Sequence, residues 1–95
     1  MLYLNVWLSV NDAAQITTVR GLLAEAAKLS RTEPGCIRFE VYHSQVDEKR
    51  FLLSERWESP EALNVHRTGT AYTSIYQPKV LPLVTREGHP CSLVE

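Results

Sequence analysis

The chain has 95 residues, and we expect it to form a single domain over residues 1–95. Hydrophobic residues account for 44% and charged residues for 22%, which is a globular composition and excludes a disordered or fibrous chain. The net charge is −1, from ten Lys and Arg against eleven Asp and Glu. A nucleic-acid partner is not expected, because binding nucleic acid requires a dense basic face.

The sequence also limits the expected compartment. No apolar run approaches the roughly 20 residues that span a bilayer, so no membrane partner is expected. The first ten residues lack the basic start of a signal peptide, and Asn5 and Ser9 interrupt their apolar character. Two cysteines, Cys36 and Cys91, are too few for a disulfide framework. We therefore predict a cytoplasmic protein.

The first ten residues alternate between two faces, which is typical of a β-strand. One face carries the aliphatic side chains Leu2, Leu4, Val6, Leu8 and Val10, and the other carries Tyr3, Asn5, Trp7 and Ser9. Asn11 and Asp12 then offer a helix N-cap. Apolar residues at helical spacing predict a helix over 16–27, which ends by Pro34 and Gly35.

Two further strands are predicted over residues 36–43 and 50–57, joined by the polar loop 44–49. In the first of these strands, Ile37, Phe39 and Val41 are expected on one face, with Cys36, Arg38, Glu40 and Tyr42 on the other. In the second, the shared face carries Phe51, Leu53, Glu55 and Trp57.

A second helix is predicted to begin at Ser59–Pro60–Glu61, where a hydroxyl cap precedes a proline. We expect it to break near Gly69, to resume over 70–76 and to be ended by Pro78 and Pro82. A short last strand is predicted over 91–95. This order predicts an α+β fold of the ferredoxin-like, split βαβ type, an antiparallel sheet with both helices on one face.

Two helices on one side of a sheet leave its other side uncovered. Both faces of the first strand carry apolar side chains, which indicates that a second cover is present. We therefore predict a homodimer whose two sheets pack face to face. The alternative is that the loop predicted over 79–90 folds across the sheet.

Three stretches of the sequence resemble the antibiotic biosynthesis monooxygenase domain. They are residues 33–42 (EPGCIRFEVY), 50–59 (RFLLSERWES) and 61–66 (EALNVH), and the resemblance extends from the first strand to Tyr76. It implies a dimeric α/β barrel with one pocket per subunit, between sheet and helices. Members of the family include cofactor-independent monooxygenases of quinols and polyketide phenols, haem-degrading enzymes, and enzymes that process a phosphorylated sugar without oxidation.

The resemblance implies three catalytic residues by position. Asn5 lies where haem-degrading members hold an asparagine, Trp57 where polyketide-oxidising members have a tryptophan, and His66 where quinol-oxidising members resemble this chain. Haem degraders have a tryptophan at the position of His66 and a histidine at that of Tyr76. This difference argues against haem, and no cofactor is expected.

Other positions depart from the family. The asparagine and tyrosine that the polyketide-oxidising enzyme uses near its tryptophan align with Leu53 and Leu63. The specific activity of those members therefore does not carry over intact.

Each candidate residue has a functional and a structural interpretation. The Asn5 amide could donate to a phenolate or peroxide oxygen, or bond to neighbouring backbone. The Trp57 indole could stack on an aromatic substrate, or simply fill the core. His66 could accept a proton from a hydroxylated aromatic compound, or lie partly exposed on its helix.

Three further residues are candidates for substrate binding. Tyr72 and Tyr76 are four residues apart on one helix face and could line the same pocket. Arg38 could hold an anionic group, or be a solvated strand arginine. No metal site is expected, because His43, His66 and His89 lie on separate elements without ligand spacing.

The leading hypothesis is a cofactor-independent monooxygenase that oxidises a quinol-like or polyphenolic small molecule with dioxygen. In it, His66 acts as the base, Asn5 stabilises oxyanion charge and Trp57 orients the aromatic substrate. A second hypothesis is a non-oxidative isomerase or lyase for a small (phospho)sugar-like carbonyl compound, with a polar pocket into which Arg38 or Lys28 points. A third is a non-catalytic dimeric ligand-binding module, which predicts a narrow pocket and His66 turned to solvent.

Overall fold

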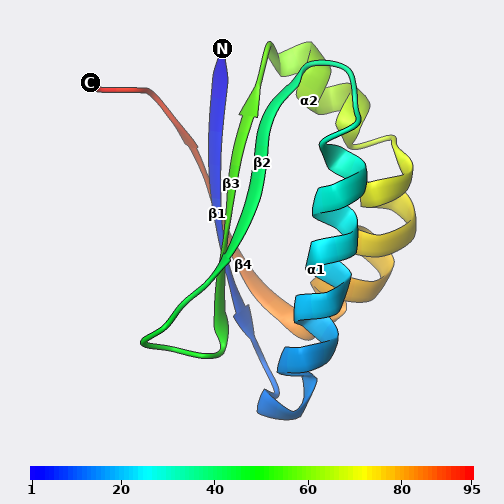
Figure 1. The fold of residues 1–95 in the computed structure, drawn as a ribbon, viewed down its shortest axis with the longest axis vertical. Helices are drawn as coiled ribbons and strands as arrows, with labels where there is room; N and C mark the ends of the chain where they lie inside the picture. The colour runs from blue at the N-terminus through cyan, green and yellow to red at the C-terminus, as the bar shows by residue number, and fades with distance from the viewer.

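Four antiparallel strands form one sheet, and all the helical segments lie on one side of it (Figure 1). The computed structural model describes residues 1–95, and the strands follow the order β2-β3-β1-β4 across the sheet. In chain order the elements are β1 (Leu2–Val10), η1 (Ala13–Gln15), α1 (Ile16–Ser30), β2 (Cys36–His43), β3 (Arg50–Trp57), α2 (Pro60–His66), η2 (Ala71–Val80), η3 (Leu81–Leu83) and β4 (Val84–Cys91). The predicted α+β, ferredoxin-like fold is confirmed.

The core lies between the sheet and the helices. The predicted aliphatic face of β1 is buried there, with Leu8 and Val6 almost fully enclosed. Val19 and Leu23 of α1 pack against it. β3 contributes Phe51 and Trp57, both with 1% or less of their surface exposed. None of the helices has the length and apolar character needed to cross a membrane.

Both predicted helix starts are confirmed. Asp12 accepts a hydrogen bond from the backbone N–H of Ala14 at 2.9 Å and begins the short turn η1 that leads into α1. The Ser59 hydroxyl accepts from the N–H of Ala62 at 3.2 Å, and Pro60 occupies the first turn of α2.

The predicted faces of β2 are wrong at its start. A register shift between Cys36 and Arg38 leaves Ile37 half exposed, whereas Cys36 packs against the core. An extra residue in one strand of an antiparallel pair moves its neighbours to the opposite face. From Phe39 onward the alternation follows the prediction.

The predicted last strand is also misplaced. β4 runs from Val84 to Cys91, and the residues 92–95 follow it without regular structure. The sequence predicts a loop over 79–90, because this segment is rich in proline. β4 pairs only with β1, and an edge strand tolerates a proline and polar side chains.

Helical structure continues past the position where prolines were expected to end it. η2 is a π-helix with Pro78 inside it, and η3 contains Pro82. A proline removes one backbone hydrogen bond. Ile75, Tyr76 and Val80 are nevertheless buried, and this packing holds the segment in place.

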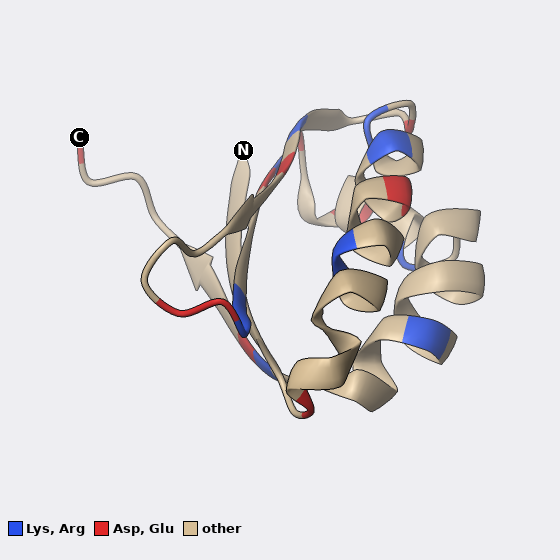
Figure 2. Ribbon diagram, turned by 60° about the horizontal axis from the view of Figure 1, so that its bottom comes forward, with Lys and Arg blue, Asp and Glu red and all other residues tan.

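The face of the sheet opposite the helices is uncovered. It carries Tyr3 and Trp7 of β1, each under an arginine guanidinium: Arg56 lies 5.2 Å from the Tyr3 ring centre and Arg50 4.6 Å from that of Trp7. Residues 84–91 form the edge strand β4 and do not fold across this face. Charged residues of both signs are scattered over the chain in Figure 2.

Candidate functional site

A pocket with an empty volume of about 450 Å³ opens between the helices and the sheet. Nine of its 14 lining residues are hydrophobic, among them Leu4, Phe39 and Leu63. Its polar lining consists of Ser30, Glu55, His66, Arg67 and Arg86. A few polar groups in an apolar cleft are typical of a small-molecule site.

The pocket is narrow in this conformation. Its enclosed part has room for little more than one water molecule. An aromatic ring therefore does not fit unless lining side chains move. Tyr72, which is half-buried, is one of the lining residues.

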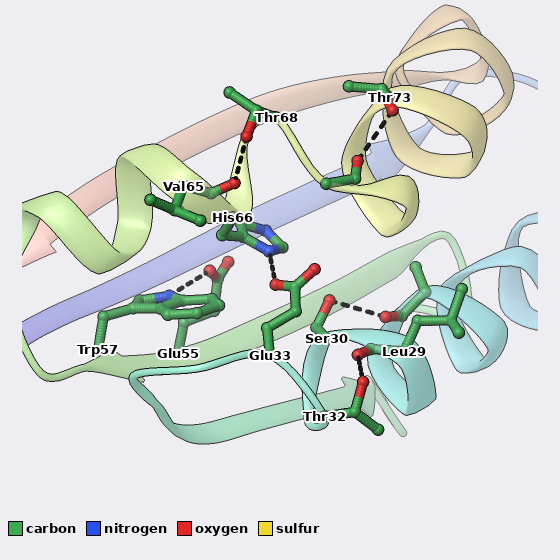
Figure 3. A network of polar contacts seen from close by, with 12 residues as sticks. Leu29, Ser30, Thr32, Glu33, Glu55, Trp57, Val65, His66, Thr68 and Thr73 are labelled. Carbon is green, nitrogen blue, oxygen red and sulfur yellow. Dashed lines mark hydrogen bonds and ion pairs between the residues drawn. The ribbon is translucent and has the colours of Figure 1, made fainter.

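His66, the last residue of α2, lies in the pocket wall and is held by a carboxylate (Figure 3). Its Nδ1 is 2.5 Å from Oε1 of Glu33, and 8% of the His66 side chain is exposed. An ionised carboxylate only accepts hydrogen bonds, so Nδ1 carries the hydrogen. In the neutral ring this leaves the Nε2 lone pair free, as a base requires.

Aromatic rings surround the imidazole of His66. The ring centre of Trp57 lies 4.6 Å away, that of Phe39 5.7 Å and that of Tyr72 5.9 Å. Trp57 is fully buried and does not line the pocket. It therefore supports His66 rather than meeting a ligand.

Glu33 reaches His66 from the turn after α1. Gly35 has a φ of +80°, which favours glycine, and its Cα lies so close to α2 that an added Cβ would be 2.6 Å from the Cβ of Ala62. Gly69 leaves room for the Glu33 carboxylate, since a Cβ there would be 2.9 Å from Oε2. The close approach at these two glycines therefore allows the Glu33 carboxylate to reach the His66 imidazole.

Glu55 is a buried acid that sequence reasoning did not single out. Its carboxylate accepts a hydrogen bond from Nε1 of Trp57 at 3.0 Å, and 5% of the residue is exposed. Burial raises the pKa of this carboxyl, against smaller lowering effects of the Trp57 bond and of His66. An acid on the apolar face of Phe51, Leu53 and Trp57 was the signal that could have found it.

Tyr72 and Tyr76 of η2 both line the pocket. Their ring centres are 5.4 Å apart. The Tyr76 hydroxyl accepts a hydrogen bond from Nε of Arg86 at 3.2 Å. Burial raises the pKa of Tyr76, which therefore stays a neutral phenol at neutral pH.

Two of the predicted residues lie elsewhere. Asn5 points to the uncovered face of the sheet, because it alternates with the buried Leu4 and Val6, and its Nδ2 is 3.4 Å from Sγ of Cys91. Arg38 is on the same face, bound to Glu40 and Tyr42. The structure therefore brings Trp57, His66, Tyr72 and Tyr76 together and separates Asn5 and Arg38 from them.

Comparison with known proteins gives a family but no substrate. Residues 1–77 match the family model of the antibiotic biosynthesis monooxygenases. The chain is 40% identical over 37 residues to the uncharacterized protein sll1783 of Synechocystis, covering 25% of that protein. It is 26% identical over 68 residues to the uncharacterized protein YjcS of Bacillus subtilis, covering 72% of this chain and 65% of YjcS. The chain thus spans less than two thirds of these curated relatives.

Solved structures with low sequence identity share the fold. A conserved protein of unknown function from Bacteroides thetaiotaomicron has a TM-score of 0.89 at 21% identity, covering 97% of this chain and 96% of that one. A mutant of SnoaB, a cofactor-independent oxygenase from Streptomyces nogalater, has a TM-score of 0.84 at 13% identity, covering 99% and 93%. Because the family model spans most of the sequence, this chain belongs to the antibiotic biosynthesis monooxygenase family.

Proposed function

We propose that this chain oxidises a quinol-like or polyphenolic small molecule with dioxygen, without a metal or organic cofactor. The observation that carries the proposal is His66 in an aromatic-walled pocket, with Nδ1 bound to the Glu33 carboxylate. The family and the fold shared with SnoaB, a cofactor-independent oxygenase, support it.

The reaction begins with a proton transfer to His66. Nε2 takes the proton of a substrate hydroxyl, and the resulting anion is electron-rich enough to reduce dioxygen directly. Oxygen then bonds to a ring carbon as a peroxide, which takes up a proton. Loss of water leaves a carbonyl, so that one oxygen atom stays on the substrate and the other leaves with two hydrogens.

The remaining residues orient the substrate and donate a proton to the peroxide. Glu55, whose pKa is raised by burial, can hold a proton and deliver it to the peroxide. Tyr72 and Tyr76 pack against the substrate ring. Trp57 acts as a positioning residue through its hydrogen bond to Glu55 and its contact with the His66 ring. Asn5 has no part in this site within one chain.

Oxygen uptake with menadiol tests this function, and the His66→Ala variant should lose about 10²–10⁴-fold in rate because it lacks the base. His89→Ala is the matched control, because His89 is exposed on the edge strand β4. Equal uptake by the wild type and His66→Ala, above a protein-free blank, would rule the assignment out.

The two alternative hypotheses agree less well with the residues that line the pocket. A sugar isomerase or lyase was expected to point Arg38 or Lys28 into a polar pocket, but Arg38 lies on the opposite face, Lys28 is exposed, and the lining is mainly apolar. A ligand-binding module was expected to combine a narrow pocket with a solvent-facing histidine. The pocket is narrow, but His66 is buried.

We also propose that the chain works as a cytoplasmic homodimer. Support for the dimer comes from the uncovered sheet face with Tyr3 and Trp7. The two free cysteines fit a reducing compartment.

A further inference from the structure

The polar part of the pocket lining contains two arginines. Arg67 follows directly after His66 at the end of α2, and Arg86 comes from β4, on the other side of the pocket. Neither arginine has a carboxylate oxygen within 4.0 Å. Glu55 is the only acid in the lining. Both guanidinium groups lower the pKa of Glu55 from a distance, but neither makes a direct ion pair with it. Two exposed guanidinium groups therefore flank an apolar cavity without a carboxylate bound to either of them.

Arg86 is held in place at the pocket. Its Nε donates to the hydroxyl of the buried Tyr76 at 3.2 Å. The rest of its guanidinium lies over Gly88, where an added Cβ would be 2.7 Å from Nη1. This single bond uses Nε and leaves both Nη groups without a protein acceptor. They are free to bind an anion at two points, as guanidinium groups do with carboxylates.

We infer that the substrate is an anionic aromatic compound, a phenol or quinol that carries a carboxylate, whose acid group binds Arg86 and Arg67. The phenolic part of this inference rests on the proposed function. The apolar walls accept the ring, with its hydroxyl toward His66. The carboxylate stays with the exposed arginines, because an anion buried against the apolar walls would lack a partner.

Binding of two matched probes tests this inference without oxygen chemistry. The probes are 1-hydroxy-2-naphthoate and its methyl ester, which share the hydroxynaphthalene ring and differ in charge. We expect isothermal titration calorimetry to give the naphthoate at least about tenfold tighter binding, which corresponds to one charge-assisted contact. Arg86→Gln and Arg67→Gln should each reduce this preference, and the double variant should abolish it.

Two further variants keep the test decisive. Arg20→Gln removes an arginine that lies outside this pocket, beside His43, and should leave the preference unchanged. Arg86→Lys keeps the positive charge and should retain part of the preference, which separates loss of charge from loss of fold. Thermal unfolding of each variant checks that it is folded.

Some results would overturn the inference. They are equal binding of ester and naphthoate by the wild type, or an unchanged preference in the double variant. Slower oxygen uptake in Arg86→Gln with an intact preference would assign the arginine to oxygen chemistry instead. Failure of the proposed function is separate, because it would appear as absent menadiol oxidation while the naphthoate preference remained.

Discussion

His66 acquires its chemistry from residues that are distant in the sequence. Glu33 lies 33 positions away, yet its carboxylate sets which imidazole nitrogen carries the hydrogen. The rings of Trp57 and Phe39 lie beside the same imidazole. The sequence predicted His66 as a candidate but not its contact with Glu33, because contact across a turn and a helix end depends on how the elements pack.

Removing the Glu33 carboxylate should slow menadiol oxidation by about 10- to 100-fold, because His66 loses the group that orients it. Glu33→Gln should fall between the wild type and Glu33→Ala, since its amide oxygen still accepts a hydrogen bond but carries no charge. Oxygen uptake measures the rates, and nitrogen NMR of histidine reports the hydrogen on Nδ1 independently of activity. Glu25→Ala, on the exposed side of α1, is the control. A wild-type rate in Glu33→Ala would contradict the prediction.

Glu55 should make stability depend on pH. Its folded-state pKa is raised by burial, so the folded protein holds its proton longer than the unfolded chain does. The free energy of unfolding should therefore fall as pH rises from the ordinary glutamate value of 4.5 through the raised pKa.

The Glu55→Gln variant isolates this effect. The amide can still accept the hydrogen bond from Trp57 but does not ionise, so the variant should gain stability relative to the wild type as pH rises. Urea unfolding at a series of pH values measures the difference, with the exposed Glu61→Gln as control. A difference that does not change with pH would disprove the role of burial.

At the level of elements, α1, α2 with its following turn, and η2 form the helix-side wall of the pocket. Their boundaries were predicted in part: the start at Pro60 and the break near Gly69 are confirmed, but the end at Pro78 is wrong. Local propensity places a helix start well, because the cap residues are adjacent. It places this helix end badly, because burial of Ile75 and Tyr76 outweighs the hydrogen bond that Pro78 removes.

Alanine at two glycines should separate packing from function. In Gly69→Ala the new Cβ would lie 2.9 Å from Oε2 of Glu33 and 3.3 Å from the backbone oxygen of His66. The flexible Glu33 side chain can move away, so we expect the free energy of unfolding to change by about 1 kcal/mol. Oxygen uptake should fall, because the carboxylate is displaced from His66. In Gly21→Ala the Cβ meets nothing within 4 Å on the exposed side of α1, and we expect about 0.5–1 kcal/mol of added stability with unchanged uptake. Unchanged uptake in Gly69→Ala would count against the Glu33–His66 pair.

At the level of the whole molecule, the sheet has one covered and one uncovered face. Tyr3 and Trp7 on the uncovered face are each stacked under an arginine, so they are partly shielded even in one chain. A second copy with its sheet packed on this face would bury both rings, which is the arrangement we propose for the homodimer.

A single charge on this face should break the dimer. We expect the wild type to sediment as a dimer at micromolar concentration and Trp7→Glu as a monomer, because a carboxylate would be buried against a second sheet. Val65→Glu is the control, since Val65 is also apolar and is 62% exposed but lies on α2. A monomeric wild type in sedimentation velocity would contradict the proposal.

The sequence by itself determined the order of the elements, the buried face of β1 and β3, and the helix starts, because alternation and capping are local patterns. It also indicated the family through three stretches of strand and helix. Only the tertiary structure decided that 84–91 is an edge strand, that Asn5 faces away from His66, that Glu33 contacts His66, and that Glu55 and Arg86 line the pocket. The physical reason is that strand pairing, a one-residue register shift and the burial of a charged group depend on neighbours far along the chain.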